Sequence, residues 1–193
     1  MLPNDINLYK VFNKQTYLPY KDKLQLLLSD FSKSNDKLSK NYTPEKIDID
    51  NLDDITLIVY EDNIVSFSSV LSRPIWSKNI SRIFNRMFRN KQFDWSNPTF
   101  GIISKLTHDH QIEYCKSIGK DFVFLSIEGR KRNYLKRWTE QANEYSPGWT
   151  LCDDKKWVCK GPEQNCLQHI TYKKLSSSNI DFDLPNLQFI FPL

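Results

Sequence analysis

Glycine is scarce in this chain, and three of its five glycines fall at intervals that delimit a turn, a helix and a strand. The first of them, Gly101, lies in a predicted turn. The predicted helix Ile102–Ile118 ends at Gly119, and the apolar run Asp121–Ile127 ends at Gly129. A turn that opens a helix leading into a parallel strand directs free backbone N–H groups at one point. Because such a point binds phosphate, this unit is the clearest indication of a ligand in the sequence.

The length and composition fit a globular protein. The 193 residues are enough to bury a substantial core, and hydrophobic residues make up 39% and aromatic residues 13% of the chain. We predict a domain over residues 1–175 and a C-terminal tail over residues 176–193 that packs on the domain or on a partner. The net charge of +4 is compatible with an anionic ligand and does not by itself indicate a nucleic-acid partner.

The sequence also suggests a location in the cell. It contains no apolar run near the roughly 18 residues that a membrane-spanning helix needs. The first residues, Met1–Asp5, lack the basic and then apolar pattern of a signal peptide. We therefore predict a cytoplasmic protein without a membrane partner, in which the four cysteines are thiols rather than a disulfide framework.

Two groups of residues have the side chains of metal ligands but not the usual spacing. Cys152, Cys159 and Cys166 are seven residues apart, whereas zinc sites draw their ligands from closer pairs. His108 and His110 would point about 200° apart on a helix. We therefore predict no metal site.

The hydrophobic pattern predicts an alternation of strands and helices. In the later helix, Tyr134, Leu135, Trp138 and Ala142 form the expected buried stripe. The segment Asn79–Arg89 fits two structures, a basic amphipathic helix or a further strand of the sheet. The other predicted elements are a weak strand Leu8–Tyr17, a helix Pro19–Phe31, a hairpin of Ile55–Tyr60 and Ile64–Leu71, a helix Asn133–Tyr145, and strands Trp149–Lys160 and Cys166–Leu175.

This order of elements contains one strand–helix–strand crossover, which is too few for a doubly wound sheet. It predicts an α+β fold in which one parallel pair of strands lies within an otherwise antiparallel sheet.

The order of elements over residues 5–175, and the segments Phe100–Leu106, Gln111–Gly119 and Phe122–Ser126, resemble the cofactor-binding unit of the GNAT superfamily of acyl-CoA N-acyltransferases. The resemblance implies a three-layer α/β/α fold with a seven-stranded sheet. It also implies that Asn79–Arg89 is the fourth strand.

The family's pyrophosphate motif is Arg/Gln-x-x-Gly-x-Gly/Ala, and the matching positions here are Pro98, Gly101 and Ile103. The resemblance implies that acyl-CoA, such as acetyl-CoA, lies between the fourth and fifth strands with its pyrophosphate on the turn at Gly101. The fourth strand would pair with the pantetheine arm. The cofactor residues expected on this basis are Arg86, Met87, Phe88, Phe100, Gly101, Ile102, Ile103 and Ser104.

The same resemblance implies direct attack of an amine on the thioester, which needs a base and a proton donor. Glu128, at the end of the fifth strand, is placed for a base, or it is a surface carboxylate. Tyr134 is the nearest phenol for the acid, or it packs in the core. Asn85 could face the acceptor from the fourth strand. Arg130–Arg132 form either a site for the 3′-phosphate or a solvated basic turn.

The sequence thus predicts an N-acyltransferase that acts on a small-molecule or protein amine. One alternative is a nucleic-acid- or protein-binding module, with Arg82, Arg86 and Arg89 on a basic helix. Another is a protein of this fold that has lost catalysis. The apolar tail Leu184–Leu193 could complete the sheet of a second copy in a homodimer.

Overall fold

The computed structural model describes residues 2–33, 49–72, 79–87, 97–128, 132–152, 157–160 and 165–183. All of the predicted apolar tail Leu184–Leu193 lies outside the described residues. The prediction of a domain over 1–175 with a separate tail stays a prediction.

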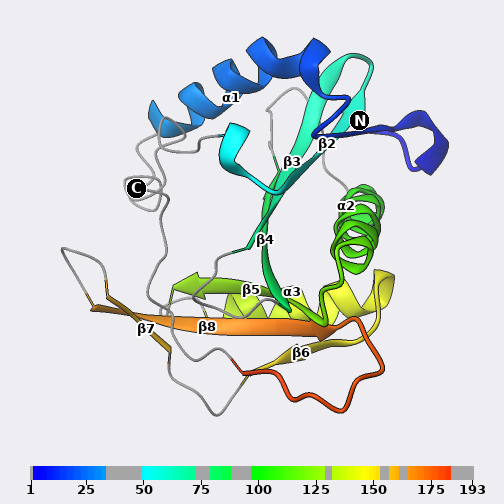
Figure 1. The fold of residues 1–193 in the computed structure, drawn as a ribbon. Helices are drawn as coiled ribbons and strands as arrows, with labels where there is room; N and C mark the ends of the chain where they lie inside the picture. The colour runs from blue at the N-terminus through cyan, green and yellow to red at the C-terminus, as the bar shows by residue number, and fades with distance from the viewer. Residues whose placement is uncertain are drawn as a thin grey trace.

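The described strands form an eight-stranded sheet in the order β1-β2-β3-β4-β5-β8-β6, with β7 pairing to β8 (Figure 1). The class matches the predicted α+β fold, and the described strands are eight where seven were expected. The predicted strand Trp149–Lys160 accounts for the difference, because the charged residues 153–156 interrupt its apolar pattern. The bounds are β1 Lys10–Asn13, β2 Asp54–Tyr60, β3 Asn63–Leu71, β4 Ile80–Met87, β5 Phe122–Glu128, β6 Trp149–Leu151, β7 Trp157–Lys160 and β8 Asn165–Lys174.

Three α-helices are described: α1 Lys21–Lys33, α2 Asn97–Ser117 and α3 Arg132–Tyr145. Helix α2 connects β4 to β5, which are the parallel pair of the described sheet. The predicted crossover is therefore confirmed. None of the described helices is long and apolar enough to cross a membrane.

The ambiguous segment is a strand. β4 pairs antiparallel with β3, from Ser66 opposite Met87 to Leu71 opposite Arg82. Pairing with distant residues decides the structure here against the helical spacing of the apolar residues. The basic-helix alternative is therefore wrong for Ile80–Met87.

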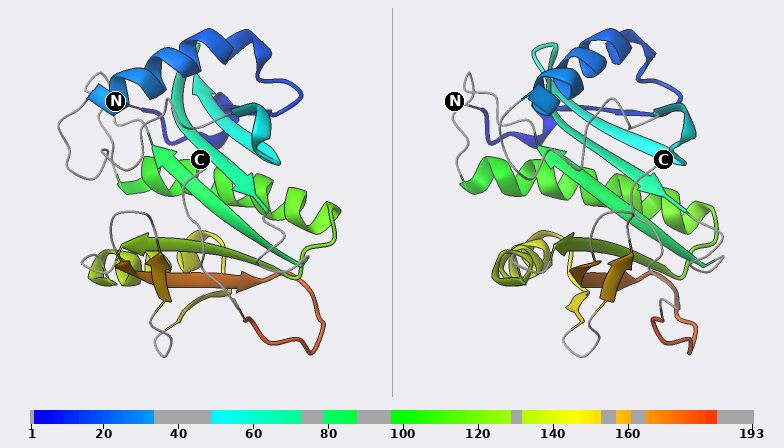
Figure 2. Two further views of the ribbon diagram at one scale, coloured as in Figure 1. Left: turned by 60° about the vertical axis from the view of Figure 1, so that its left-hand side comes forward. Right: turned by 90° about the vertical axis from the view of Figure 1, so that its left-hand side faces the viewer.

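Helices cover both faces of the sheet, which gives the three expected layers (Figure 2). On one face, Leu24 and Leu28 of α1 pack in a cluster with Leu57 of β2. On the other face, Ile58 of β2 packs with Ile103 of α2. Neighbouring residues of β2 thus face different helices, as the alternation of a strand requires.

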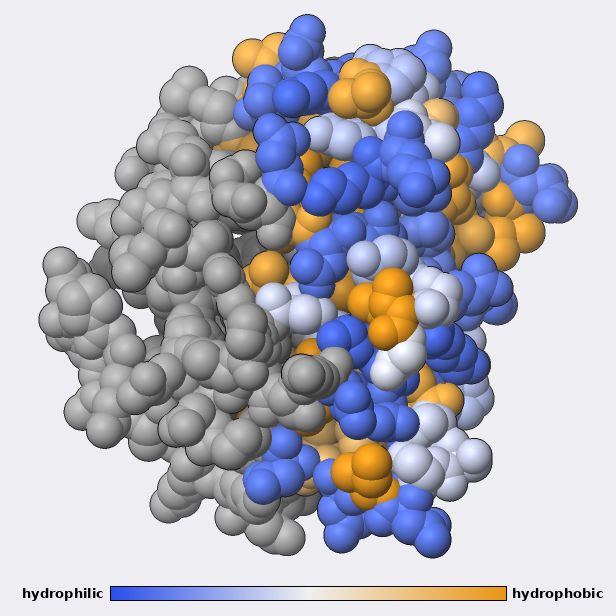
Figure 3. Space-filling model, viewed as in Figure 1, coloured by the Kyte–Doolittle hydropathy of each residue, from blue (hydrophilic) through white to orange (hydrophobic). Residues whose placement is uncertain are grey.

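The surface seen in Figure 3 offers no large apolar patch on its described part, because hydrophobic residues appear there as separate spots. Isolated spots of this kind are normal for a protein surface. The predicted homodimer stays a prediction.

Helix α2 begins five residues earlier than predicted. Residues 97–101, expected as a turn, are helical, so Gly101 lies inside the helix. A Cβ at Gly101 would overlap the ring of Tyr145, which closes α3. Glycine is needed at this position because α3 places an aromatic ring against the backbone of α2.

Helix α2 contains a buried histidine, His108, and a partly exposed one, His110. His108 is 1% exposed, and its ring lies 5.3 Å from that of Trp138 and 5.5 Å from that of Trp149. The side chain of His110 is 24% exposed, and its Nε2 lies 3.0 Å from Oδ2 of the buried Asp54. His110 on α2 therefore contacts a buried carboxylate of β2.

We expect the effect of Gly101→Ala on stability to change sign with the residue at 145. In the native chain the new methyl group must displace Tyr145, at a cost of about 1–3 kcal/mol of unfolding free energy. In a Tyr145→Ala background the space is open. Alanine is there the better helix former, by about 0.5–1 kcal/mol. Denaturant unfolding of the four proteins measures this, and a loss of equal size in both backgrounds would contradict the packing explanation.

We also expect His108 to make stability depend on pH. Burial, and to a lesser extent Lys173, lower the pKa of His108 from 6.5 to about 4. Between these values the unfolded chain binds a proton that the folded chain does not. The full stability is therefore present above pH 6.5 and falls as the pH decreases, by at most about 3 kcal/mol.

The measurement is the unfolding free energy of the native chain and of His108→Leu as a function of pH. The variant should lose less stability between pH 6.5 and pH 4. Parallel curves for the two proteins would show that His108 does not contribute to the pH dependence.

Candidate functional site

The two halves of the sheet share only a short ladder. In the described structure β4 pairs with β5 at three positions, from Ile80 opposite Phe122 to Arg82 opposite Phe124. Beyond these pairs β4 continues along β3, and β5 continues along β8 as far as Glu128 opposite Gln168. The strands therefore diverge, and Figure 2 shows them farthest apart at their carboxyl ends.

This divergence leaves two strand edges facing each other without a shared ladder. Among the described residues, 83–87 of β4 have no strand partner on the side of β5, and 125–128 of β5 have none on the side of β4. Backbone N–H and C=O groups are obligatory hydrogen-bonding groups. An extended ligand with amide groups could pair with such an edge as an added strand would.

The start of α2 lies at the same end of the molecule. Figure 2 shows the first turn of α2 beside the carboxyl ends of β4 and β5, where the two strands lie farthest apart; this divergence of the two strands is called the opening below. A helix N-terminus presents N–H groups without intrahelical carbonyl partners and attracts anions. The described structure thus brings the diverging strand edges and the N-terminus of α2 to the same end of the molecule.

The start of the helix also changes which donors could bind an anion. In an α-helix each N–H bonds the carbonyl four residues earlier. With α2 beginning at Asn97, the N–H groups of Gly101–Ser104 belong to the helical ladder. The turn expected at Gly101 is therefore helical, and the predicted pyrophosphate contact of these residues stays a prediction. The donors without intrahelical partners lie before Phe100, where Pro98 supplies none.

The cofactor-binding residues predicted on α2 do not face one common site. Ile103 is buried against Ile58, and Ile102 lies at the edge of the same cluster. Phe100 and Ser104 line a small cavity between α2 and α3. Gly101 faces Tyr145. Packing accounts for each of these positions, and their role toward a cofactor stays a prediction.

The predicted residues of β4 lie at the opening. Asn85, Arg86 and Met87 pair with β3 and form the carboxyl end of β4, while Phe88 lies outside the described residues. Their position at the diverging edge is that expected for a strand that pairs with the pantetheine arm.

Two predicted catalytic residues lie at the end of β5 and in the helix that follows it. Glu128 is the last residue of β5. Tyr134 lies in the first turn of α3 and is 59% exposed, so the alternative that it packs in the core is wrong. Leu135 is fully buried instead. The phenol of Tyr134 is accessible to a substrate, and both catalytic roles stay predictions.

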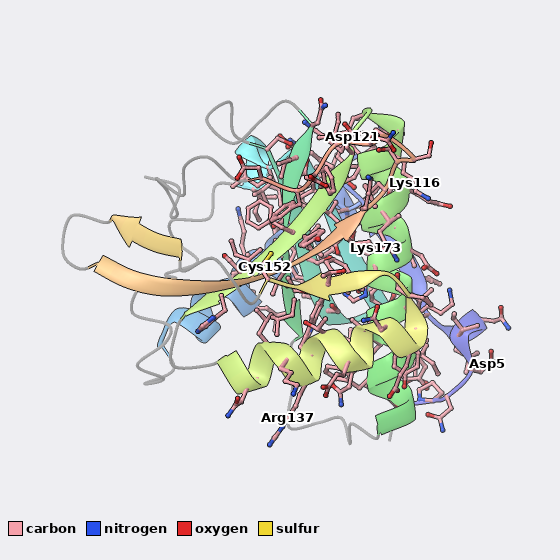
Figure 4. The ribbon with its side chains drawn as sticks, turned by 90° about the horizontal axis from the view of Figure 1, so that it is seen from below. Asp5, Lys116, Asp121, Arg137, Cys152 and Lys173 are labelled. Carbon is pink, nitrogen blue, oxygen red and sulfur yellow. The ribbon has the colours of Figure 1, made fainter. Side chains whose placement is uncertain are left out.

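Among the described residues, the titratable groups with strongly shifted pKa values lie where the helices pack on the sheet, and not between the diverging ends of β4 and β5. Burial raises the pKa of the Cys115 thiol to about 12, and Cys115 packs against the start of β5. Burial and the charge of Lys116 lower the pKa of Lys173. Figure 4 shows these two lysines near each other, on α2 and β8. Such shifts reflect packing and do not identify a catalytic group.

Lys173 fastens β8 to the end of α3. Its Nζ donates to Oγ of Ser146 at 2.8 Å and to the carbonyl of Pro147 at 2.7 Å. A cation at a helix C-terminus is favourable because of the helix dipole. Arg137, on the outer side of α3, points away from the protein in Figure 4 and takes no part in this contact.

The sequence contained a signal for the true start of α2. Ser96-Asn97-Pro98 combines residues that often cap a helix with a proline suited to its first turn. The assignment of Gly101 to a turn hid this signal. No local pattern indicates the contact with Tyr145, because it depends on how two helices cross.

A scan against protein-family models and a search of curated proteins find no match to this chain. Solved structures do match it. The acetyltransferase of the GNAT family from Streptococcus pneumoniae is 11% identical with a TM-score of 0.54, over 86% of this chain and 100% of that chain.

Two further structures give the same result. Ribosomal-protein-alanine N-acetyltransferase from Brucella melitensis is 13% identical with a TM-score of 0.54, over 85% of this chain and 99% of that chain. The yncA protein of Salmonella typhimurium, solved with its cofactor acetyl-CoA, is 8% identical with a TM-score of 0.57, over 90% of this chain and 98% of that chain. The crossover, the diverging strands and these matches together show that this chain has the fold of the GNAT acetyltransferases.

Proposed function

We propose that this chain is an N-acyltransferase that transfers an acyl group, in the first instance acetyl, from acyl-CoA to an amine. The observation that carries the proposal is the divergence of β4 and β5 after three residue pairs, with the start of α2 at the wide end. A strand edge without a ladder partner among the described residues, beside a helix N-terminus, suits a ligand that joins an amide-containing arm to a pyrophosphate.

The chain's own residues would act at three points. The backbone of residues 83–87 would bind and align the pantetheine arm, and the first turn of α2 would attract the pyrophosphate. The co-substrate supplies an activated acyl thioester. Glu128, at the end of β5, would accept the proton of the attacking ammonium, directly or through water.

As the bond from the amine nitrogen to the acyl carbon forms, the carbon–sulfur bond breaks and the sulfur takes up a proton. Tyr134 is the proposed donor of that proton, because its phenol is exposed in the helix that follows Glu128. Asn85, on β4, is the proposed contact to the acceptor. The amine could be a small molecule or a protein, and the name of the Brucella melitensis neighbour makes an N-terminal alanine one acceptor to test.

A second candidate function is a protein of this fold that does not use acyl-CoA. It is favoured by the packing role of Gly101 against Tyr145, which accounts for the glycine without a phosphate. Pro98 also removes one donor from the first turn of α2. Binding of the cofactor separates the two candidates.

We expect acetyl-CoA near 1 mM to raise the melting temperature, because a ligand that binds only the folded state stabilises it by mass action. At 100 times the dissociation constant the gain is about 2.7 kcal/mol. Differential scanning fluorimetry measures the shift, with ATP as the control for a general effect of anions. An equal shift with ATP, or none with acetyl-CoA, would favour the second candidate.

The variant Asn97→Asp tests the start of α2 directly. A carboxylate in the first turn should leave the ligand-free protein as stable or slightly more stable, because it complements the helix dipole. It should also weaken acetyl-CoA binding by about tenfold, since one repulsive charge near a phosphate is worth about 1.4 kcal/mol. Asn179→Asp makes the same change of charge in an exposed tail residue and should leave binding unchanged. Equal affinities in all three proteins would move the pyrophosphate site elsewhere.

We expect Glu128→Gln to lower the rate of acetyl transfer by about 100-fold or more, the usual range for a general base, without weakening acetyl-CoA binding. Release of the free thiol of CoA measures turnover, with spermidine and a peptide beginning with alanine as the amines. Loss of cofactor binding in the variant would instead assign Glu128 a structural role.

A further inference from the structure

The strands β7 and β8 bring two cysteines into register. They pair antiparallel, and Cys159 stands directly opposite Cys166. In an antiparallel ladder the Cα atoms of directly opposite residues are about 4.5 or 5.5 Å apart, depending on whether the pair is hydrogen-bonded. Both values lie within the range of about 4.4–6.8 Å between the Cα atoms of a disulfide. The backbone thus places these two positions at the separation that a disulfide requires.

The other two cysteines lie too far along the sheet to compete. The backbone N–H of Cys152 bonds the carbonyl of Ile170, four residues from Cys166 on β8. At a rise of about 3.3 Å per residue this is about 13 Å along the strand, beyond the limit of about 7 Å between Cα atoms. Figures 1 and 4 agree, because Cys152 lies near the middle of β8 while β7 lies beside one end.

Cys115 lies farther from Cys166 than Cys152 does, and its thiol is unreactive. It packs in the cluster of Val123, whose partner on β8 is Lys173, seven residues from Cys166. It is fully buried, and its raised pKa keeps it as the thiol rather than the reactive thiolate. Neither Cys115 nor Cys152 is therefore placed to exchange with the pair on β7 and β8.

We propose that Cys159 and Cys166 form a reversible disulfide that crosslinks β7 to β8, and that small disulfides such as oxidised glutathione are its oxidant. One thiolate attacks the sulfur–sulfur bond of oxidised glutathione, which releases one glutathione and leaves a mixed disulfide. The second thiolate then displaces the other glutathione. The two cysteines lose two electrons and two protons, and both are recovered in two molecules of glutathione. This inference does not rest on the proposed function.

The pair Cys152 and Cys159 serves as a control for the effect of the β7–β8 register on disulfide formation. Cys152 and Cys159 are seven residues apart, as are Cys159 and Cys166. In an unfolded chain the two loops have the same length, so their closure costs the same entropy. A preference for one of the two pairs in the folded protein must therefore come from the structure.

Digestion with trypsin makes the pairs easy to distinguish, since each of the four cysteines falls in a different peptide. After oxidation of the folded full-length chain with oxidised glutathione and alkylation of the remaining thiols, mass spectrometry identifies the linked peptides. The cysteine-containing peptides are Leu106–Lys116, Trp138–Lys155, Trp157–Lys160 and Gly161–Lys173.

We expect Trp157–Lys160 linked to Gly161–Lys173, in excess over the link from Trp138–Lys155 to Trp157–Lys160 by about tenfold or more. The peptides with Cys115 and Cys152 should be recovered alkylated. In concentrated guanidinium chloride the two links should form in similar amounts. Treatment of the folded crosslinked protein with dithiothreitol should restore both thiols.

Two variants complete the test. Cys152→Ser should leave the crosslink unchanged, and Cys166→Ser should trap Cys159 as its mixed disulfide with glutathione. Similar amounts of the two links in the folded chain would overturn the proposal, as would separate glutathione adducts on Cys159 and Cys166 in the native chain.

Discussion

The short parallel ladder between β4 and β5 determines the rest of this structure. Three residue pairs join the two halves of the sheet, and each half then continues along its own antiparallel neighbour. Because β3 and β8 satisfy one side of each strand, the sheet can divide without losing those ladders. The division leaves backbone groups on two facing edges, and a connection that must return parallel to β4 requires a helix that starts at the open end.

Helix α2 has the most constrained position in this arrangement, since it contacts both the sheet and α3. It buries polar side chains such as Thr107 and His108 as well as Ile103, so its sequence lacks a single apolar stripe. Its close approach to α3 depends on Gly101, where Tyr145 lies against the backbone. A glycine near the start of this helix therefore supports the assembly of the layers that hold the opening.

The elements of the fold could be predicted where local pattern and pairing agree, as in the hairpin of β2 and β3 and in β5. The helical spacing of the apolar residues in β4 would have given the wrong structure, and only the order of the surrounding elements corrected it. The start of α2 was misplaced because Gly101 was taken as a turn residue. Tyr134 was placed in a stripe wider than the one that α3 buries. The divergence of the strands, and the ring of Tyr145 beside Gly101, arise from contacts between distant segments that no local pattern contains.

The motif around Gly101 therefore carries information on the order of the elements and, separately, on the packing of one residue. The spacing of the glycines predicted the crossover correctly, yet the structural reason for Gly101 is a side chain of α3 rather than a phosphate. Pro98 and Ile103 stand where the family motif has other residues, and each has a structural explanation. Pro98 suits the first turn of a helix, and Ile103 fills the core beside Ile58. In the proposed function the first turn of α2, and neither glycine of the motif, attracts the anion. The proposed function therefore depends more on where the helix begins relative to the diverging strands than on the residues that the motif prescribes.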